Sequence, residues 1–534
     1  MGADAAAVHT ATRVAESVPR PGGLEALTRR ATLNAGASLL DYAVKAIVVL
    51  LVTPVLVSGL GRALYGVWEM LARLGTSMTA VDGRPTDALR LIIAQHQTTN
   101  DDEARRRYVG AALMVWALLL PMLAVAGGAI AWWLAPALTS ATPEMRGVVR
   151  LSAALVIAAF VLIGLASVPE AVLRGMNLGY RRMGVQASLN ILVGLLSAGA
   201  IWFGLGLAGV AAAQLGLAVA TGLCFWLLAR KFVSWFGVAR PRREDVKLVF
   251  NIGIWLAVGD AIAKVLLASD VIILGAVVAP AMVTTYVLTG YAARTAQGIH
   301  IFAAGAAIPG LGGLLGRGEL RRAAQARREL LLLTWLFGTV VGATMLMWNR
   351  GFVGLWVGAE NYAGLLVDVL VALLFLQTVF IRVDSYIIDA TLRPRLRVLI
   401  SGVAMVVVVG LSIVLARALG IAGVCLGLLA GRMIQSASYP LLSARSVGSD
   451  TGAWQAFIGT ARRVVVTALL LAAAAALGQA MEVSGWVTWV AGAVAGAAVT
   501  AGLAFAIGAD DADRRAILSR LRALRREVGG TRRS

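Results

Sequence analysis

The sequence of 534 residues contains few charged residues and very few lysines, histidines and cysteines. Charged side chains account for 14% of the chain and hydrophobic ones for 59%, and the mean hydropathy is +0.82. Since soluble domains average about 25% charged residues, this composition excludes an ordinary soluble domain. The two cysteines lie in apolar segments, which indicates no disulfide framework. The three histidines are far apart and lack neighbouring ligands at metal-site spacing, so we expect no metal and no cofactor.

Sequence motifs for nucleotide chemistry are also missing. No lysine follows the Gly-x4-Gly pattern of a P-loop, so the chain by itself is not an ATPase. Gly204–Gly209 matches the dinucleotide pattern G-x-G-x-x-G, but it follows no strand, and we interpret it as a tight turn between two packed helices. The predicted outer loops are short and carry no converging carboxylates of the kind that a membrane glycosyltransferase or polymerase needs. We therefore predict that the chain is not an enzyme.

Apolar runs of about 20 residues, long enough to cross a bilayer as helices, make up most of the chain. They predict an all-α polytopic membrane protein with about 14 transmembrane helices. The boundaries between its predicted parts fall in polar, arginine-rich loops. There are five such parts: a cytoplasmic N-terminal segment (1–35), a first six-helix bundle (36–243), a second six-helix bundle (244–446), a terminal pair of transmembrane helices (447–509) and a basic amphipathic cytoplasmic tail (510–534).

The net charge of +20 comes from arginines that gather in short loops on one side of the predicted membrane. This positive-inside pattern places both termini in the cytoplasm and argues against nucleic acid as a partner. Within one of these loops, Pro85–Gln95 predicts a short amphipathic helix that begins at the proline. The tail carries eight arginines and an apolar helical face, so it suits an anionic inner leaflet. A solvated tail that only enforces topology is the alternative.

One arrangement of polar residues occurs twice, and the rest of the chain is organised around it. In each copy an Asp precedes a Lys by four residues, and a Tyr precedes an Arg by eight. The first copy contains Asn34, Gly36, Asp41, Lys45, Tyr65 and Arg73, and the second contains Asn251, Gly253, Asp260, Lys264, Tyr286 and Arg294. Because each half has an even number of predicted spans, the repeat predicts two parallel, pseudo-symmetric halves.

Charges within the predicted spans are the candidate functional residues, because a charge at the centre of a membrane helix costs about 2.5–3.5 kcal/mol on insertion scales. Four cations are the candidate substrate-binding residues of a central site: Lys45, Arg73, Lys264 and Arg294. Two carboxylates are candidates for ion coupling or charge pairing: Asp41 and Asp260. The alternative is that each Asp–Lys pair is an i,i+4 bridge that neutralises itself on its helix. Four more charges also fall within predicted spans: Asp270, Arg382, Asp384 and Arg432.

With two six-span repeats and a terminal pair, the chain resembles the polysaccharide (Wzx-like) flippase family. That family belongs to the superfamily of multidrug, oligosaccharidyl-lipid and polysaccharide exporters. The resemblance covers residues 30–507. Local features also fit the family: Gly61-x3-Tyr65-Gly66-x-Trp68, Gly179-Tyr180-Arg181-Arg182, and Asp270-x3-Leu274-Gly275 with Tyr286.

The resemblance implies two lobes that form a V around a central cationic cavity, which opens to one side of the membrane at a time. It implies that a polyprenyl-pyrophosphate-linked oligosaccharide is flipped from the inner to the outer leaflet of the inner or plasma membrane, for cell-surface polysaccharide synthesis. The implied partners are this glycan, membrane lipids, H⁺ or Na⁺ as a coupling ion, and a polysaccharide polymerase. A cation- or proton-coupled drug antiporter of the same superfamily is the alternative. Since every Asp of the repeat has a basic neighbour, the sequence favours an anionic substrate.

Overall fold

The structure is a computed structural model of the chain, and it consists of helices and their connections throughout the residues that it describes. These residues are 21–78, 84–96, 101–176, 178, 183–305, 308–390, 395–448, 453–511 and 514–515. Side chains are described at the same positions except 21–39, 77–78, 183, 255, 259, 263, 267, 308–310, 316 and 453–459. Most of the predicted basic tail and the predicted motif at 179–182 lie outside the described residues.

The first half of the chain forms long helices that run between the two ends of the molecule, with short elements between them. In order they are α2 (Pro21–Met78), α3 (Pro85–Gln95), α4 (Asp102–Ala129), η1 (Ile130–Leu134), α5 (Ala135–Leu138), α6 (Arg146–Gly175), α7 (Met183–Trp202) and α8 (Gly206–Phe232). The tight turn predicted between two helices is confirmed, because Gly204 and Gly206 both have positive φ angles between α7 and α8.

The second half continues in the same way. Its elements are α9 (Arg243–Val277), α10 (Pro280–Thr289), α11 (Tyr291–Gly305), α12 (Ile308–Gly316), α13 (Leu320–Val357), η3 (Ala359–Asn361), α14 (Leu365–Ala390), α15 (Arg395–Ser446), α16 (Ala453–Ala480), α17 (Trp486–Leu503) and η4 (Ala504–Gly508).

Eleven helices of the described chain are long and apolar enough to cross a membrane. Two of them contain a glycine with a non-helical conformation: Gly61 in α2 (φ 74°, ψ 166°) and Gly420 in α15 (φ 56°, ψ −129°). Because a positive φ costs glycine little, each of them lets the chain change direction between two helical stretches. The all-helical membrane fold is therefore confirmed. The count of about 14 spans and the grouping into two six-helix bundles stay predictions.

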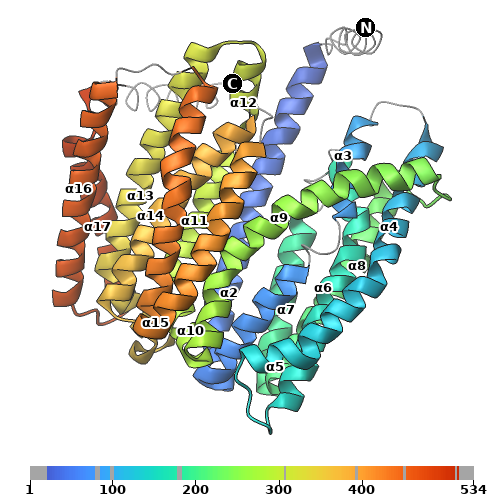
Figure 1. Cartoon of the computed structure of the whole chain (residues 1–534), viewed down its shortest axis with the longest axis horizontal. Coiled ribbons are helices and arrows are strands. Elements are labelled where there is room, and N and C mark those ends of the chain that lie inside the picture. The colour runs from blue at the N-terminus through green and yellow to red at the C-terminus, as the bar shows by residue number, and fades with distance from the viewer. Residues whose placement is uncertain are drawn as a thin grey trace.

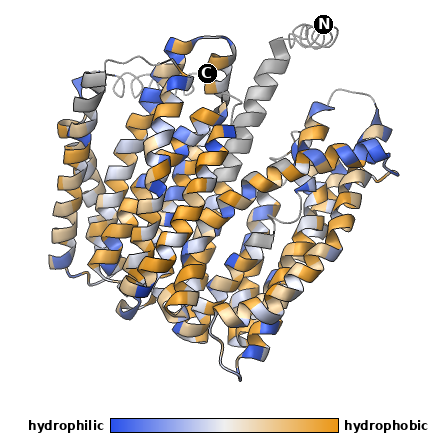
Figure 2. Ribbon diagram, in the orientation of Figure 1, coloured by the Kyte–Doolittle hydropathy of each residue, from blue (hydrophilic) through white to orange (hydrophobic). Residues whose placement is uncertain are grey.

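The helices form two groups that meet at one end of the molecule and separate toward the other (Figure 1). One group contains α3 to α8 and the other α10 to α17, with α2 and α9 between them. The α8–α9 connection, with Arg240 and Arg242, and the α12–α13 connection, with Arg317, lie at the separated end, and the α7–α8 turn lies at the joined end. Hydrophobic residues dominate the middle of the molecule, and hydrophilic ones collect near helix ends (Figure 2). At the joined end, exposed Trp202 and Phe203 suit a membrane–water interface.

The short helix predicted at Pro85–Gln95 is confirmed as α3, with the same bounds. Its apolar face is buried inside the protein and does not lie on the membrane surface. Leu89, Ile92 and Ile93 are at most 1% exposed, and they pack with residues of α4, α6 and α9. Burying one such side chain contributes about 1.5–3 kcal/mol, so α3 is part of the core of the first group.

The long helix α2 joins the two groups. Five hydrogen bonds among the described residues tie it to the second half. They are Tyr42 Oη to Thr295 O (2.8 Å), Tyr291 Oη to Ala46 O (2.7 Å), Arg62 Nη2 to Thr285 Oγ1 (2.8 Å), Thr284 Oγ1 to Arg62 O (2.6 Å) and Trp356 Nε1 to Leu50 O (2.6 Å). At the joined end, Gly66 lies so close to the Pro280 carbonyl that any Cβ at position 66 would overlap with it. The absence of a side chain at Gly66 therefore permits the close approach of α2 and α10.

The apolar run that begins at Val283 is long enough to predict a single span, but the structure divides it at Gly290 into α10 and α11. The carbonyl of Thr289, next to this break, accepts a hydrogen bond from Asn349 Nδ2 (2.9 Å). Asn349 also donates to Asp368 Oδ1 (2.7 Å), and the Tyr362 hydroxyl donates to the other oxygen of this carboxylate (3.0 Å). Burial raises the pKa of Tyr362, so the phenol keeps the proton that it donates. This buried polar cluster stabilises a break that the sequence of the span does not signal.

Candidate functional site

A cavity of about 260 Å³ lies between α2 and helices of the second half. Its charged lining residues come from four helices: Arg73 from α2, Asp270 from α9, Arg294 from α11 and Arg432 from α15. Apolar residues of α14, among them Phe375, complete the wall. Arg73 and Arg294 are the matched arginines of the two copies, so the two halves of the repeat meet at this cavity.

Arg294 is held in place by the second half. Its Nη2 donates to the carbonyl oxygens of Tyr286 (3.2 Å) and Val287 (2.7 Å), and its guanidinium lies 5.2 Å from the centre of the Tyr286 ring. Its Nη1 lies 3.9 Å from Asp270 Oδ2, which makes a loose ion pair. The same carboxylate oxygen accepts a hydrogen bond from the Tyr286 hydroxyl (2.9 Å). Asp270 therefore orients Tyr286 and Arg294 together, from one side of the cavity.

Arg432 of α15 contributes a further positive charge to the cavity. Its Nη1 donates to Thr378 Oγ1 (2.9 Å) and its Nη2 to the carbonyl of Leu266 (3.1 Å), and both acceptors are neutral. The cavity wall thus carries three arginines and one carboxylate. Excess charge of one sign inside a membrane protein is costly, so this lining suits an anionic ligand that supplies the missing negative charge.

The Asp–Lys pair of the second copy is part of an ion-pair network. Asp260 Oδ2 lies 2.8 Å from Lys264 Nζ and 3.1 Å from Arg84 Nη1. Arg84 also pairs with Asp87 of α3 (2.6 Å). The network connects α9 to α3, and it neutralises Lys264 as the self-neutralising alternative expects. Lys264 and Asp260 do not line the cavity that contains Arg73 and Arg294.

Lys45 occupies the matching position in the first copy, but its surroundings differ. Its side chain is exposed, and the described residues place no carboxylate within ion-pair distance of it, so the bridge to Asp41 that the spacing allows is not formed. Lys45 is three residues from Tyr42, which bonds to α11, and three from Val48, which packs next to Gly194 of α7. It therefore lies on the face of α2 between these two contacts.

Of the four predicted cations, the structure brings Arg73 and Arg294 together and leaves Lys45 and Lys264 apart from them. Asp270 and Arg432 complete the cavity, although neither has a counterpart in the other copy. The only sequence signal for these two residues is a charge within a predicted span. Within the described ranges, no three His, Cys, Asp or Glu side chains gather closely enough to hold a metal ion.

A family model described as "Polysaccharide biosynthesis protein" matches residues 32–314. Among solved structures, the chain is similar to the "inward-facing conformation of a multidrug resistance MATE family transporter of the MOP superfamily". The TM-score is 0.64 at 15% identity, over 78% of this chain and 98% of that one. The outward-facing conformation of a MATE family transporter matches with a TM-score of 0.55 at 16% identity, over 78% and 95% of the two chains.

A third structure, MATE in complex with MaD3S, matches with a TM-score of 0.56 at 15% identity, over 78% of this chain and 96% of that one. At such identities the likeness shows the fold alone, and that fold is the one of MATE transporters. No curated protein sequence matches the chain significantly.

Proposed function

Because the chain belongs to the polysaccharide biosynthesis protein family and has the fold of membrane transporters, we propose that it flips a lipid-linked oligosaccharide. The substrate is a glycan on polyprenyl pyrophosphate, and it moves from the inner to the outer leaflet of the inner or plasma membrane. The separated end of the two helix groups faces the cytoplasm in this proposal, together with both termini. This orientation puts the arginines of the α8–α9 and α12–α13 connections inside, in agreement with the positive-inside rule.

The arginine-lined cavity is the observation that carries the proposal. Guanidinium groups form paired hydrogen bonds with phosphate oxygens, and charge-assisted bonds are the strongest hydrogen bonds in proteins. Arg294 is oriented in advance by Tyr286 and Asp270, so little ordering is needed when a phosphate binds. Arg73 and Arg432 approach from other helices, which suits an anion with oxygens pointing in several directions, as pyrophosphate has.

The remaining predicted residues have different roles in this proposal. Lys45 attracts the pyrophosphate or acidic sugars during entry, because it is exposed and carries an unpaired charge in the described part of the chain. Lys264 with Asp260 fixes α9 against α3. Asp41 and Asp260 are the carboxylates through which a coupling ion, H⁺ or Na⁺, could act. A polysaccharide polymerase is the proposed consumer of the exported glycan.

A cation-coupled drug antiporter is the competing function, since the similar solved structures are multidrug transporters. A cationic drug needs a cavity in which carboxylates outnumber cations. Here three arginines surround one carboxylate, and Asp270 is already bound to Tyr286 and Arg294. The charge of the cavity therefore supports the anionic, lipid-linked substrate.

Deletion of the gene tests the proposed function in cells. The lipid-linked glycan should then accumulate on the cytoplasmic side of the membrane, where it is protected from enzymes added outside. Wild-type protein expressed from a plasmid should reverse the accumulation, and Arg294→Gln should not. Normal export in the deletion strain, with lost resistance to cationic drugs, would contradict the proposal and favour the antiporter.

A further inference from the structure

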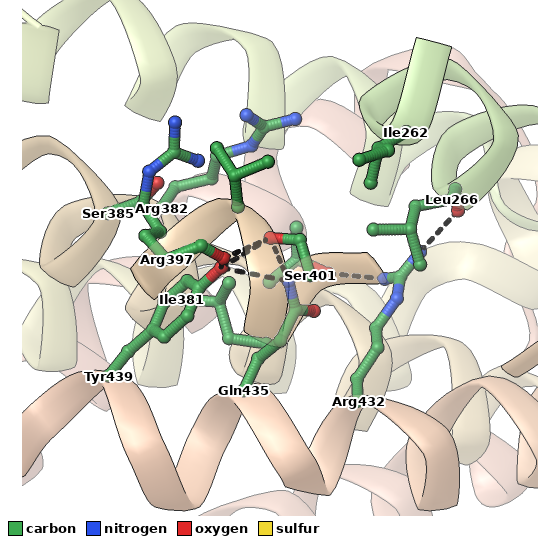
Figure 3. A pocket seen from close by; sticks show the side chains of 12 residues that line it. Ile262, Leu266, Ile381, Arg382, Ser385, Arg397, Ser401, Arg432, Gln435 and Tyr439 are labelled. Atoms are coloured by element: carbon green, nitrogen blue, oxygen red, sulfur yellow. Dashed lines mark hydrogen bonds between the residues drawn. The ribbon is translucent and has the colours of Figure 1, made fainter. Parts of the chain in front are cut away.

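A second, smaller cavity of about 80 Å³ lies within the second half, between α9, α14 and α15. Three arginines and no carboxylate are among the residues that line it: Arg382 of α14, with Arg397 and Arg432 of α15. Figure 3 shows Arg432 on one side of the pocket, beside Leu266, and Arg382 and Arg397 toward the other. The repeated pattern in the sequence includes none of these three residues.

Arg382 is the least satisfied of the three. Its side chain is half-buried, and within the described chain it makes no ion pair and no hydrogen bond. Asp389 pairs with Arg397 at 2.7 Å and also attracts the charge of Arg382 from a greater distance, but it does not line the cavity. An arginine within a membrane helix is costly unless a polar or anionic group meets it, so the position of Arg382 points to a bound anion.

A buried polar wall stands between the arginines. Ser401 and Tyr439 are hydrogen-bonded through their hydroxyls (2.6 Å), and Gln435 Nε2 donates to Tyr439 Oη (3.3 Å). All three side chains are at most 7% exposed. Because they hold one another in place, the wall is formed before any ligand enters.

The size of the cavity limits what it can hold. Its volume of about 80 Å³ is less than a third of the 260 Å³ of the arginine-lined cavity, so it suits a small anionic group better than a whole glycan. A phosphate group is such an anion. The planar guanidinium matches the geometry of phosphate oxygens better than any other side chain does.

The small cavity adjoins the arginine-lined cavity of the proposed function. Arg432 and Thr378 line both of them, and Thr378 Oγ1 accepts a hydrogen bond from Arg432 Nη1 at the shared wall. A phosphate held by Arg382 could therefore pass to Arg73 and Arg294 while it stays in contact with Arg432.

We propose that the cavity of Arg382, Arg397 and Arg432 is a second phosphate-binding site, which takes one phosphate group of the lipid carrier on its way into the larger cavity. The identity of the carrier rests on the proposed function, whereas the phosphate chemistry rests on this cavity alone. The same chemistry could come from free phosphate or from an anionic phospholipid headgroup.

Binding by the full-length protein in nanodiscs of zwitterionic lipid tests this site. The probes are inorganic phosphate, polyprenyl pyrophosphate and phosphatidylglycerol. Arg382→Gln should weaken the binding of inorganic phosphate and of polyprenyl pyrophosphate about tenfold or more, and Arg382→Lys should weaken it less, because the charge is kept. Arg417→Gln is the matched control, since Arg417 is exposed and lies near the break of α15 at Gly420. Its affinities should equal those of the wild type.

The thermal midpoint of Arg382→Gln should stay at the wild-type value, because this side chain has no bond within the described chain to lose. Unchanged affinities in Arg382→Gln would overturn the site. If Arg382→Gln binds phosphatidylglycerol more weakly but binds polyprenyl pyrophosphate as the wild type does, the assignment to the carrier is wrong.

The inference and the proposed function can fail separately. If Arg294→Gln loses polyprenyl pyrophosphate and Arg382→Gln does not, the second site is wrong and the proposed function stands. If the wild type binds inorganic phosphate through Arg382 but does not bind polyprenyl pyrophosphate, the phosphate site stands and the proposed substrate is wrong.

Discussion

The ammonium group of Lys264 lies 2.8 Å from the carboxylate of Asp260, and Arg84, the residue just before α3, reaches the same oxygen at 3.1 Å. Lys45, at the matching position of the first copy, is exposed and has no such ion pair among the described residues. Two identical spacings therefore lead to two different physical states. The surroundings of each helix decide between them, because Arg84 supplies a second cation beside Asp260.

This difference predicts that replacing each lysine by Gln affects stability at one position and export at the other. Lys264→Gln should lower the free energy of unfolding by about 1.5 kcal/mol, the lower end for a hydrogen bond to a charged group, because Arg84 still holds Asp260. Lys45→Gln should leave stability unchanged and reduce export. Thermal unfolding of the purified variants, with transport measured alongside, checks both statements. Equal losses of stability in the two variants would show that Lys45 is also a structural partner.

The packing of α3 predicts a strong effect at one position and almost none at its neighbour. Ile93 is fully buried, so Ile93→Ala should destabilise the protein by about 2–5 kcal/mol. Leu91 on the same helix is 40% exposed, and Leu91→Ala should change stability by about 0.5 kcal/mol or less. Denaturation of both variants in the same detergent measures the difference. Similar losses at both positions would mean that α3 is not packed in this register.

The contact between Gly66 and Pro280 predicts that the joined end can be forced open. In Gly66→Ala the new methyl group overlaps the Pro280 carbonyl, and such overpacking costs about 1–3 kcal/mol. A cysteine introduced at the buried Thr284 should then react faster with a membrane-impermeant thiol reagent added outside. Gly128→Ala is the control, because nothing lies within 4 Å of a Cβ there. Identical reaction rates in the two backgrounds would refute the close contact.

Much of the fold follows from the sequence because hydrophobic length and charge placement act locally. The bounds of α3, the helical spans and the glycine turn between α7 and α8 all come from residues next to one another in the chain. The break between α10 and α11 does not. It depends on Asn349 and Thr289, which meet only after folding, and no proline marks it. Local sequence therefore predicts an unbroken span there.

The candidate site was predictable only where the repeat marked it. Arg73 and Arg294 line one cavity, and their matched positions single them out. Arg432 also lines this cavity, but it has no counterpart in the other copy. It comes from α15, far along the chain, so only the folded structure brings it beside Arg73 and Arg294. The bridge between Lys264 and Asp260 follows from their i,i+4 spacing. The second cation on Asp260 does not, since the pairing with Arg84 depends on how α3 docks on α9.

Flipping by purified protein in liposomes tests the central claim most directly. The substrate is a fluorescent sugar on a short polyprenyl pyrophosphate, and its arrival in the opposite leaflet is followed by quenching from outside. Wild-type protein should flip it. Arg73→Gln and Arg294→Gln should each lower the apparent affinity about ten- to a hundredfold, the loss expected for one or more charge-assisted hydrogen bonds. If wild-type protein transports a cationic dye and leaves the lipid-linked sugar in place, or if both arginine variants flip it at the wild-type rate, the account is wrong.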